Sequence, residues 1–315
     1  MAVERGAGRV KRHALLRRAG LVRRRAARLD PNLRGLLWAI AAGLSFVGLN
    51  TLMRALTLQL HPFQTQFLRY LCGVLVMLPL VLRSGLGAYR PRNIGGQFGR
   101  GAVHTFGLLL WFSAIPHISL ADTTAIGFMV PIFVMLGAAW LLGERLRWDR
   151  WAAALVGLAG VAIVVAPKLT GDGGVYTLIM LASGPVFAAS FLFTKGLTRY
   201  ERAEVIVVWQ SITVALFSLP FALLEWRAPT ASQWLQFFAC GILGSVGHYL
   251  LARAFTVTDI SATQSVKFLD LVWATLMGWL VFGDTPSRST LIGGSVICAS
   301  TVWIARRETR GALPH

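Results

Sequence analysis

Two oppositely charged side chains lie close together in a segment of this sequence that is otherwise apolar. Lys267 and Asp270 are three residues apart within residues 258–282, so in a helix they would lie on one face. Charged groups are expensive to hold away from water, and they are usually paired or kept for a function. Asp270 could form a structural ion pair with Lys267, or alternate between Lys267 and a proton or substrate cation. We favour the second interpretation, because a purely structural pair could be replaced by two apolar residues.

Arg69, His104 and His248 also lie in apolar segments. The planar guanidinium of Arg69 could bind a substrate carboxylate or phosphate through parallel hydrogen bonds, or satisfy backbone carbonyls freed near a helix break. The sequence does not separate these two roles. The two histidines could relay protons near neutral pH, although a histidine in an apolar segment is more often a hydrogen-bond partner between helices.

Two tryptophans, Trp111 and Trp273, lie well inside apolar segments rather than at their ends. Their rings could stack on a planar substrate or on a cation, or they could fill space in the core. The candidate substrate-binding or coupling residues are therefore Asp270, Lys267, Arg69, His104, His248, Trp111 and Trp273.

No pattern in the sequence predicts a metal, a cofactor or a catalytic centre. The three cysteines are an odd number and lack the spacing of metal ligands. The motifs HExxH, GxSxG and GxxxxGK[ST] are absent, so neither a metalloprotease, a serine hydrolase nor an ATP-driven pump is indicated. An integral membrane enzyme is kept only as a distant alternative.

The candidate residues are distributed over apolar segments long enough to cross a bilayer. Of the 315 residues, 55% are hydrophobic and 14% are charged, whereas soluble domains carry about 25% charged residues. A helix of about 20 apolar residues spans the hydrocarbon core. The sequence thus predicts an all-α integral membrane protein with ten spans, at about residues 35–57, 63–82, 97–115, 119–142, 148–166, 174–194, 204–224, 233–252, 258–282 and 287–305.

The second half of the chain repeats the first at an offset of about 140 residues. Leu78-Pro79 corresponds to Leu219-Pro220, and Gly143-Glu144 corresponds to Gly283-Asp284. Each copy holds five spans, an odd number, so the second copy enters the membrane from the opposite side. Inverted repeats are typical of secondary transporters, whose substrate site lies near the membrane midplane. The predicted organisation is a basic arm at residues 1–32, five-helix repeats at residues 33–167 and 173–306, and a tail at residues 307–315.

Basic residues are concentrated at the start of the chain, where residues 1–34 hold 11 of the 31 Lys and Arg. Beyond residue 34, if ten helices alternate, 14 fall on the side of the N-terminus and four on the other. Both termini are therefore predicted to be cytoplasmic. The arm could lie on anionic lipid headgroups as a basic helix, or form a disordered tail. Because membrane orientation accounts for the positive charge, nucleic-acid binding is not expected.

Arg69, the run 125–144 that closes on Leu-Leu-Gly-Glu, and its counterpart 265–284 that closes on Val-Phe-Gly-Asp carry a resemblance to a known family. They resemble the drug/metabolite transporter superfamily, in particular its two-domain, ten-helix, EamA-type branch. The match covers roughly residues 33–306. Within it, residues 267–273 (Lys-Phe-Leu-Asp-Leu-Val-Trp) look most like bacterial carriers for the uptake of S-adenosylmethionine or riboflavin.

This resemblance implies a secondary active transporter of small organic metabolites in the bacterial inner membrane. It implies alternating access, with proton coupling as one option. An exporter of amino acids or drugs is the alternative to an uptake carrier. The implied partners are a small-molecule substrate and membrane lipid, no cofactor is implied, and a homodimer is left open.

Overall fold

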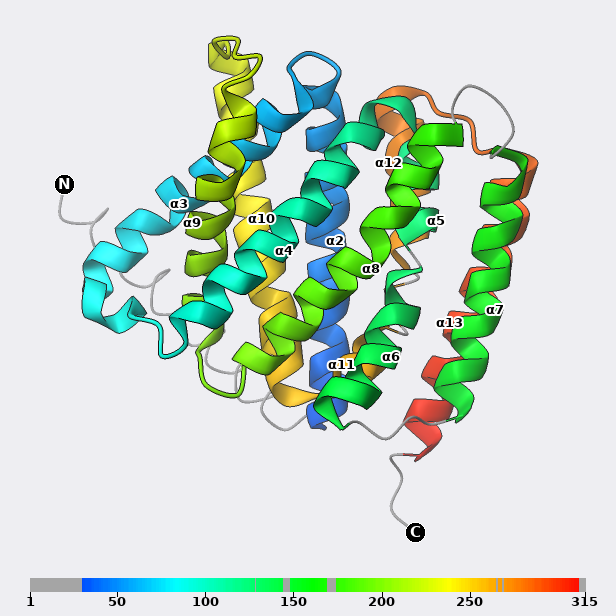
Figure 1. The fold of residues 1–315 in the computed structure, drawn as a ribbon. Helices are drawn as coiled ribbons and strands as arrows, with labels where there is room; N and C mark the ends of the chain where they lie inside the picture. The colour runs from blue at the N-terminus through cyan, green and yellow to red at the C-terminus, as the bar shows by residue number, and fades with distance from the viewer. Residues whose placement is uncertain are drawn as a thin grey trace, which may run out of the picture.

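The structure, a computed structural model, describes residues 30–127, 129–143, 148–168, 174–264, 266–267 and 269–311. Within this part of the chain every regular element is a helix, in agreement with the all-α prediction (Figure 1). Most of the predicted basic arm, residues 1–32, lies outside the described residues, and so does the end of the predicted tail, residues 312–315.

Short connections join the helices along the chain. The helices are α2 (Pro31–Thr57), α3 (Pro62–Ser84), α4 (Ile94–Ala114), α5 (Leu120–Gly127), α6 (Val130–Leu142), α7 (Trp148–Val165), α8 (Gly174–Leu197), α9 (Ala203–Ala222), α10 (Ala231–Val257), α11 (Ile260–Gln264), α12 (Leu269–Phe282) and α13 (Arg288–Gly311). Three short 3-10 helices, η1 (Leu86–Tyr89), η2 (Ile115–His117) and η3 (Ala166–Lys168), follow α3, α4 and α7.

Local sequence explains where several helices begin and end. The Asp30 carboxylate accepts a hydrogen bond from the backbone N–H of Asn32 at 2.8 Å, and Pro31 takes the first position of α2. Both features are favourable at a helix N-terminus, where backbone N–H groups lack partners. At the other end, α6 and α12 each stop at a glycine, Gly143 and Gly283, with φ of 69°. Glycine adopts this left-handed conformation without the steric cost of a Cβ.

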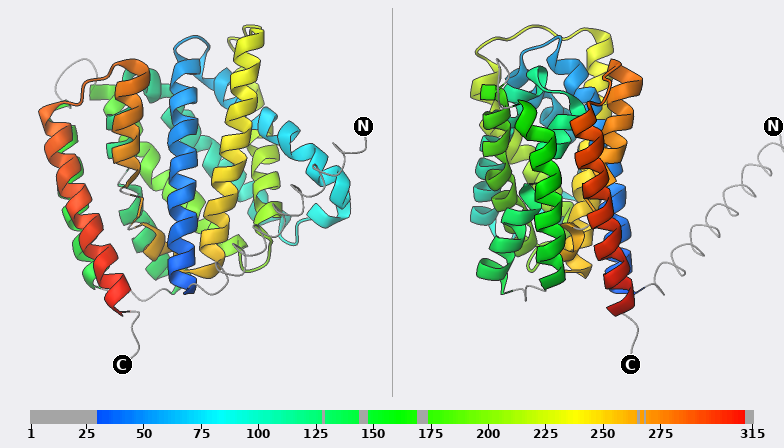
Figure 2. Two further views of the ribbon diagram at one scale, coloured as in Figure 1. Left: turned by 180° about the vertical axis from the view of Figure 1, so that it is seen from behind. Right: turned by 90° about the vertical axis from the view of Figure 1, so that its right-hand side faces the viewer.

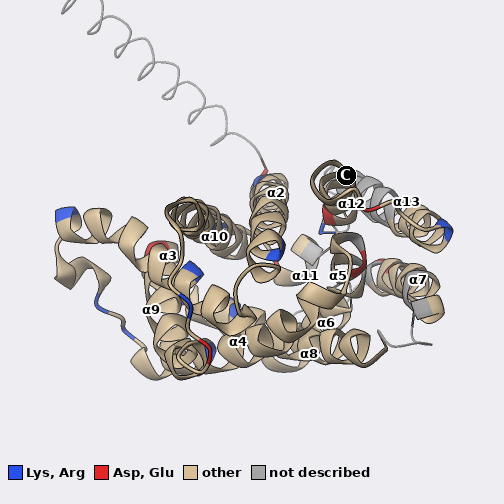
Figure 3. Ribbon diagram, turned by 90° about the horizontal axis from the view of Figure 1, so that it is seen from above, with Lys and Arg blue, Asp and Glu red and all other residues tan. Residues whose placement is uncertain are grey.

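Five helices of the described residues, α2, α3, α8, α9 and α10, are long and apolar enough to cross a membrane. Helices α6 and α12 and the central part of α7 are also apolar but shorter. The helices run side by side in one bundle (Figure 2), and seen from above the ribbon carries few charged residues (Figure 3). This arrangement suits a hydrocarbon environment, since helices satisfy their own backbone hydrogen bonds.

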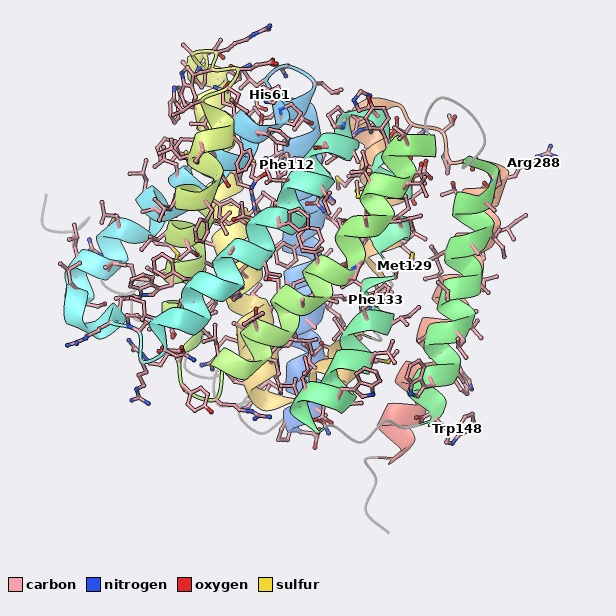
Figure 4. All side chains as sticks on the ribbon, in the orientation of Figure 1. His61, Phe112, Met129, Phe133, Trp148 and Arg288 are labelled. Carbon is pink, nitrogen blue, oxygen red and sulfur yellow. The ribbon has the colours of Figure 1, made fainter. Side chains whose placement is uncertain are left out.

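Two of the ten predicted spans are not continuous helices, which corrects the sequence interpretation. The segment 119–142 is divided into α5 and α6, and the segment 258–282 into α11 and α12. The first interruption precedes Pro131, which lies in the first turn of α6, where a missing N–H costs no helical hydrogen bond. Met129 lies at this interruption, between α5 and α6 (Figure 4). The other eight predicted spans correspond to single helices.

The helices pack in pairs that join distant parts of the chain. Helix α2 packs on α10, α4 on α8, α3 on α9 and α7 on α13, and further contacts join α3 to α10 and α4 to α9 (Figures 1 and 2). Small residues allow the closest of these approaches. A Cβ added to Gly241 of α10 would lie 2.8 Å from the backbone carbonyl carbon of Cys72 in α3, so only glycine fits there.

Candidate functional site

A cavity of about 200 Å³ lies inside the bundle. Its wall is built by α2, α3, α4, α8 and α10 together with both interrupted segments. The lining includes Phe112 of α4, which is labelled in Figure 4. Six of the seven candidate residues from the sequence line this one cavity: Arg69, His104, Trp111, His248, Lys267 and Asp270. The seventh, Trp273, is 37% exposed and is not part of the lining, so the structure does not bring it to the others.

Lys267 and Asp270 do not form the intrahelical ion pair that was one of the two expectations. Lys267 lies in the turn that precedes α12, and only Asp270 is helical. Among the described residues no ion pair within 4.0 Å joins the two side chains. The Lys267 Nζ instead lies 4.1 Å from the centre of the Phe191 ring, a cation–π contact.

Asp270 occupies the first turn of α12, where the positive end of the helix dipole stabilises a carboxylate. Its side chain lies against Gly43 of α2, and a Cβ at position 43 would collide with the Asp270 carboxylate. Gly43 therefore makes room for this carboxylate at the cavity wall.

Arg69 is 6% exposed and reaches the cavity from α3. Its guanidinium carbon lies 4.2 Å from the centre of the Tyr70 ring. A Cβ at Gly244 of α10 would come within 3.0 Å of one Arg69 Nη, so glycine leaves space for the guanidinium. Within the described residues the buried Nε of Arg69 has no hydrogen-bond partner. The expectation that Arg69 satisfies backbone carbonyls finds no support in these contacts.

His104 and His248 lie next to each other, with ring centres 5.5 Å apart in an edge-to-face arrangement. His104 Nε2 lies 2.9 Å from the hydroxyl of Tyr70, and its Nδ1 lies 2.9 Å from the hydroxyl of Ser190. Both ring nitrogens of His104 are thus occupied by hydroxyl groups from α3 and α8. This is the interhelical hydrogen bonding that was the plainer expectation for a histidine in an apolar segment.

Arg100 of α4 is a buried residue of this network that is not among the candidate residues predicted from the sequence. It is 2% exposed, and its guanidinium donates to the Thr194 hydroxyl at 2.6 Å, the Ile206 carbonyl at 3.2 Å and the Gln210 Oε1 at 2.6 Å. Because arginine only donates, Gln210 must turn its oxygen toward Arg100 and its amide nitrogen toward His248, 3.2 Å away. His248 Nε2 is then the acceptor, as assigned from this network.

Within the described part of the chain no group of three or more His, Cys, Asp or Glu side chains could hold a metal ion. Cys72 and Cys240 are buried free thiols.

Comparison with known proteins identifies the family. Residues 33–166 and residues 175–306 match the EamA-like transporter family. The chain belongs to the EamA-like transporter family. The resemblance found in the sequence is thereby confirmed, and the helices long enough to span a membrane agree with it.

Several proteins named as transporters resemble this EamA-family chain over most of their length. It is 31% identical over 279 residues to a riboflavin transporter of Rhizobium johnstonii, covering 88% of this chain and 92% of the relative. It is 26% identical over 282 residues to an S-adenosylmethionine uptake transporter of Rickettsia prowazekii, covering 90% and 96%. It is 26% identical over 275 residues to a pseudopaline exporter of Pseudomonas aeruginosa, covering 87% and 96%.

The fold is shared with a solved crystal structure that is 22% identical in sequence. The two superpose with a TM-score of 0.68 over 87% of this chain and 98% of the other. At this identity the likeness concerns the fold alone.

Proposed function

We propose that this chain is a secondary active transporter that carries a small organic metabolite across the bacterial inner membrane by alternating access. The observation that carries the proposal is the position of the cavity. It is bordered by Gly127 and Val130 on the two sides of one interrupted segment, and by Lys267 and Asp270 at the other. Interrupted helices beside a buried cavity are how many transporters bind substrates near the membrane midplane.

The proposal includes two inverted five-helix repeats, at residues 33–167 and 173–306. Exchanging the halves would replace α2 by α8, α3 by α9 and α4 by α10. The contact between α2 and α10 then corresponds to that between α8 and α4, and the contact between α3 and α10 to that between α9 and α4. The contacts α3–α9 and α7–α13 would join each helix to its own counterpart. The observed packing contains every one of these pairs, and the two matches to one family support the same division.

Uptake is the direction we propose, because the relatives include an S-adenosylmethionine uptake transporter. The alternative is export, which the similarity to a pseudopaline exporter favours. For coupling we propose Asp270, which lies on an interrupted segment and has no ion pair within 4.0 Å among the described residues. A carboxylate in this position can exchange a proton or a cationic group as the cavity opens to each side.

The transport claim can be tested with purified protein in proteoliposomes. We expect Asp270→Asn to lower substrate accumulation by about tenfold or more, the size of losing one charged interaction, and to remove its dependence on a pH gradient. Glu225→Gln is the matched control, since Glu225 is exposed beyond the end of α9, and it should transport as the wild type does. If Asp270→Asn left both substrate exchange and pH dependence intact, the coupling role would be wrong.

The proposed orientation, with both termini cytoplasmic, has a separate test. Arg90 lies at the end where α9 begins, because Arg202 at that end donates a hydrogen bond to the Ala88 carbonyl. Glu225 lies one helix length away, beyond the other end of α9. In a cysteine-free background, an impermeant thiol reagent added to intact cells should label Glu225→Cys and not Arg90→Cys. Labelling of Arg90→Cys alone would show that the orientation is the opposite of the one proposed.

A further inference from the structure

Three arginines on the helices around the cavity differ in how their charge is satisfied. Arg54 of α2 forms an ion pair with Asp284. Arg100 of α4 donates hydrogen bonds to three acceptors. Arg69 of α3 is 6% exposed, yet within the described residues no hydrogen bond or ion pair is recorded for its guanidinium. The chain therefore supplies acceptors of its own to the guanidinium groups of Arg54 and Arg100, although Arg54 Nε has no partner among the described residues. To the guanidinium of Arg69, in the cavity wall, the described residues supply no acceptor.

An incomplete buried guanidinium needs a partner from the cavity. The group remains protonated in proteins and carries five N–H donors, so burial without acceptors is costly. The Tyr70 ring meets one face of the Arg69 guanidinium, and Gly244 keeps space beside one Nη. A ring face offers no lone pair in the guanidinium plane, so the in-plane donors are still unmet. A planar carboxylate fits that fork with two parallel hydrogen bonds.

A carboxylate that forms no ion pair within 4.0 Å among the described residues lines the same cavity from a different element. Asp270 belongs to α12, and Gly43 of α2 leaves room for its oxygens. The nearest basic residue in sequence, Lys267, interacts electrostatically with Asp270. It forms no ion pair within 4.0 Å with Asp270 in the described part of the chain, and its Nζ lies over the Phe191 ring. The cavity thus offers an anion-binding fork on α3 and a cation-binding carboxylate on α12.

We propose, resting on the transport function above, that the substrate is a zwitterion whose carboxylate binds Arg69 and whose cationic group binds Asp270. A purely cationic substrate would leave the Arg69 donors unmet and would face the positive charges of Arg69 and Lys267. A purely anionic substrate would satisfy Arg69 but bring no cationic group to Asp270, and a neutral one would satisfy neither group. Trp111, Phe112 and Phe187 supply the apolar part of the lining, against which the body of the substrate packs.

The test begins with proteoliposomes that contain the wild-type protein and are incubated with a small-molecule extract of bacterial cells. Mass spectrometry then identifies the compounds that accumulate. We expect compounds that carry both a carboxylate and a cationic group. Accumulation restricted to neutral compounds, or to compounds with charge of one sign, would overturn the inference.

Chemical analogues of the accumulated compound then connect each charge to its residue. Arg69→Gln should weaken binding of the parent compound by about tenfold or more, as expected for a charged hydrogen bond, and should barely change binding of its methyl ester. Asp270→Asn should likewise weaken binding of the parent compound by about tenfold or more, and should barely change binding of its N-acetyl derivative, which lacks the cationic group. Arg69→Lys keeps the charge without the fork and should lie between. Equal losses for parent and ester in Arg69→Gln would show that Arg69 does not contact the carboxylate.

The two proposals can fail separately. Each variant is first compared with the wild type in thermal unfolding, so that a folding defect is not read as a binding defect. If nothing accumulates, the transport function is wrong, and fractions of the extract are then screened for heat stabilisation of the purified wild type. A stabilising fraction containing zwitterions would still support the substrate class. The absence of any such fraction would refute it.

Discussion

Replacing Arg100 by methionine should destabilise the protein severely, although Arg100 contacts no proposed substrate atom. The substitution removes hydrogen bonds to Thr194, to the Ile206 carbonyl and to Gln210. Bonds of this charged kind contribute about 1.5–3 kcal/mol each, and removal of the buried charge offsets part of the sum. We therefore expect a net loss of about 3–5 kcal/mol, since three neutral acceptors lose their donor and each buried group left unsatisfied costs about 1–3 kcal/mol.

The matched substitution Arg69→Met should behave in the opposite way. No hydrogen bond of the described residues is lost, and an unpaired buried charge is replaced by an apolar group of similar length. The unfolding temperature of Arg69→Met should therefore equal or exceed that of the wild type, while its transport is lost. The unfolding temperature of Arg100→Met should fall by at least about 6 °C, taking about 2 °C per kcal/mol for a large domain.

The assay is thermal unfolding of the three purified proteins in one detergent, followed by tryptophan fluorescence, with Arg100→Lys as a variant that keeps the charge but not the fork. Arg100→Lys should lie between the wild type and Arg100→Met. Equal destabilisation by Arg69→Met and Arg100→Met would refute the reasoning, because it would mean that Arg69 is held by structural bonds of its own. An unfolding temperature of Arg100→Met within about 2 °C of the wild type, less than 1 kcal/mol, would refute it as well.

Two further predictions concern the bundle rather than the cavity. A double-mutant cycle of Arg54→Gln and Asp284→Asn should give a coupling free energy of about 1 kcal/mol. The value is small because this ion pair is only partly buried, with side-chain exposures of 12% and 25%. Additive effects of the two substitutions in unfolding experiments would show that the pair is not coupled. Gly241→Ala should destabilise the protein by about 1–3 kcal/mol, because the new methyl group meets the backbone of α3. Gly48→Ala, whose Cβ would have Leu243 as its nearest neighbour at 3.7 Å, should leave the unfolding temperature unchanged or raise it, and equal losses in the two variants would contradict the packing argument.

Most of the helical layout could be predicted from the sequence because hydrophobicity and span length are local properties. The predicted segment 63–82 became α3, Pro62–Ser84, and the segment 204–224 became α9, Ala203–Ala222. The same criterion identified Arg69 and Asp270, since a charge inside an apolar segment is conspicuous without any knowledge of its neighbours. Both residues lie inside their spans rather than at the ends, and both line the cavity.

The interruptions could not be predicted in the same way, because an apolar run looks continuous whether or not its backbone turns. Lys267 was expected to share a helix face with Asp270, but the turn before α12 carries Lys267 to the ring of Phe191 on α8. Trp273 shows a second limit. Its depth within the segment was visible from the sequence, whereas the side of α12 that it occupies depends on packing, and the structure leaves it 37% exposed.

Arg100 shows a third limit, which concerns partners distant in the sequence. It lay near the start of the predicted segment 97–115, where an arginine is usually at the membrane surface. Helix α4 begins earlier, at Ile94, and so carries Arg100 more than one turn into the bundle. Its acceptors come from α8 and α9, about 100 residues later in the chain, and no local pattern could have indicated them.

The contrast between Arg69 and Arg100 also bears on how a carrier of this kind would cycle. An empty cavity with separate, unpaired charges opposes closure, because closing it removes water from Arg69 and Asp270 without supplying partners. A zwitterion that pairs with both residues removes that cost, so the loaded protein should close more readily than the empty one. Arg54 and Asp284, which join α2 to the end of α12, would have to separate or move together whenever that end opens. If the proposed function holds, exchange of substrate across the membrane should therefore be faster than net transport, since only net transport requires return of the empty cavity.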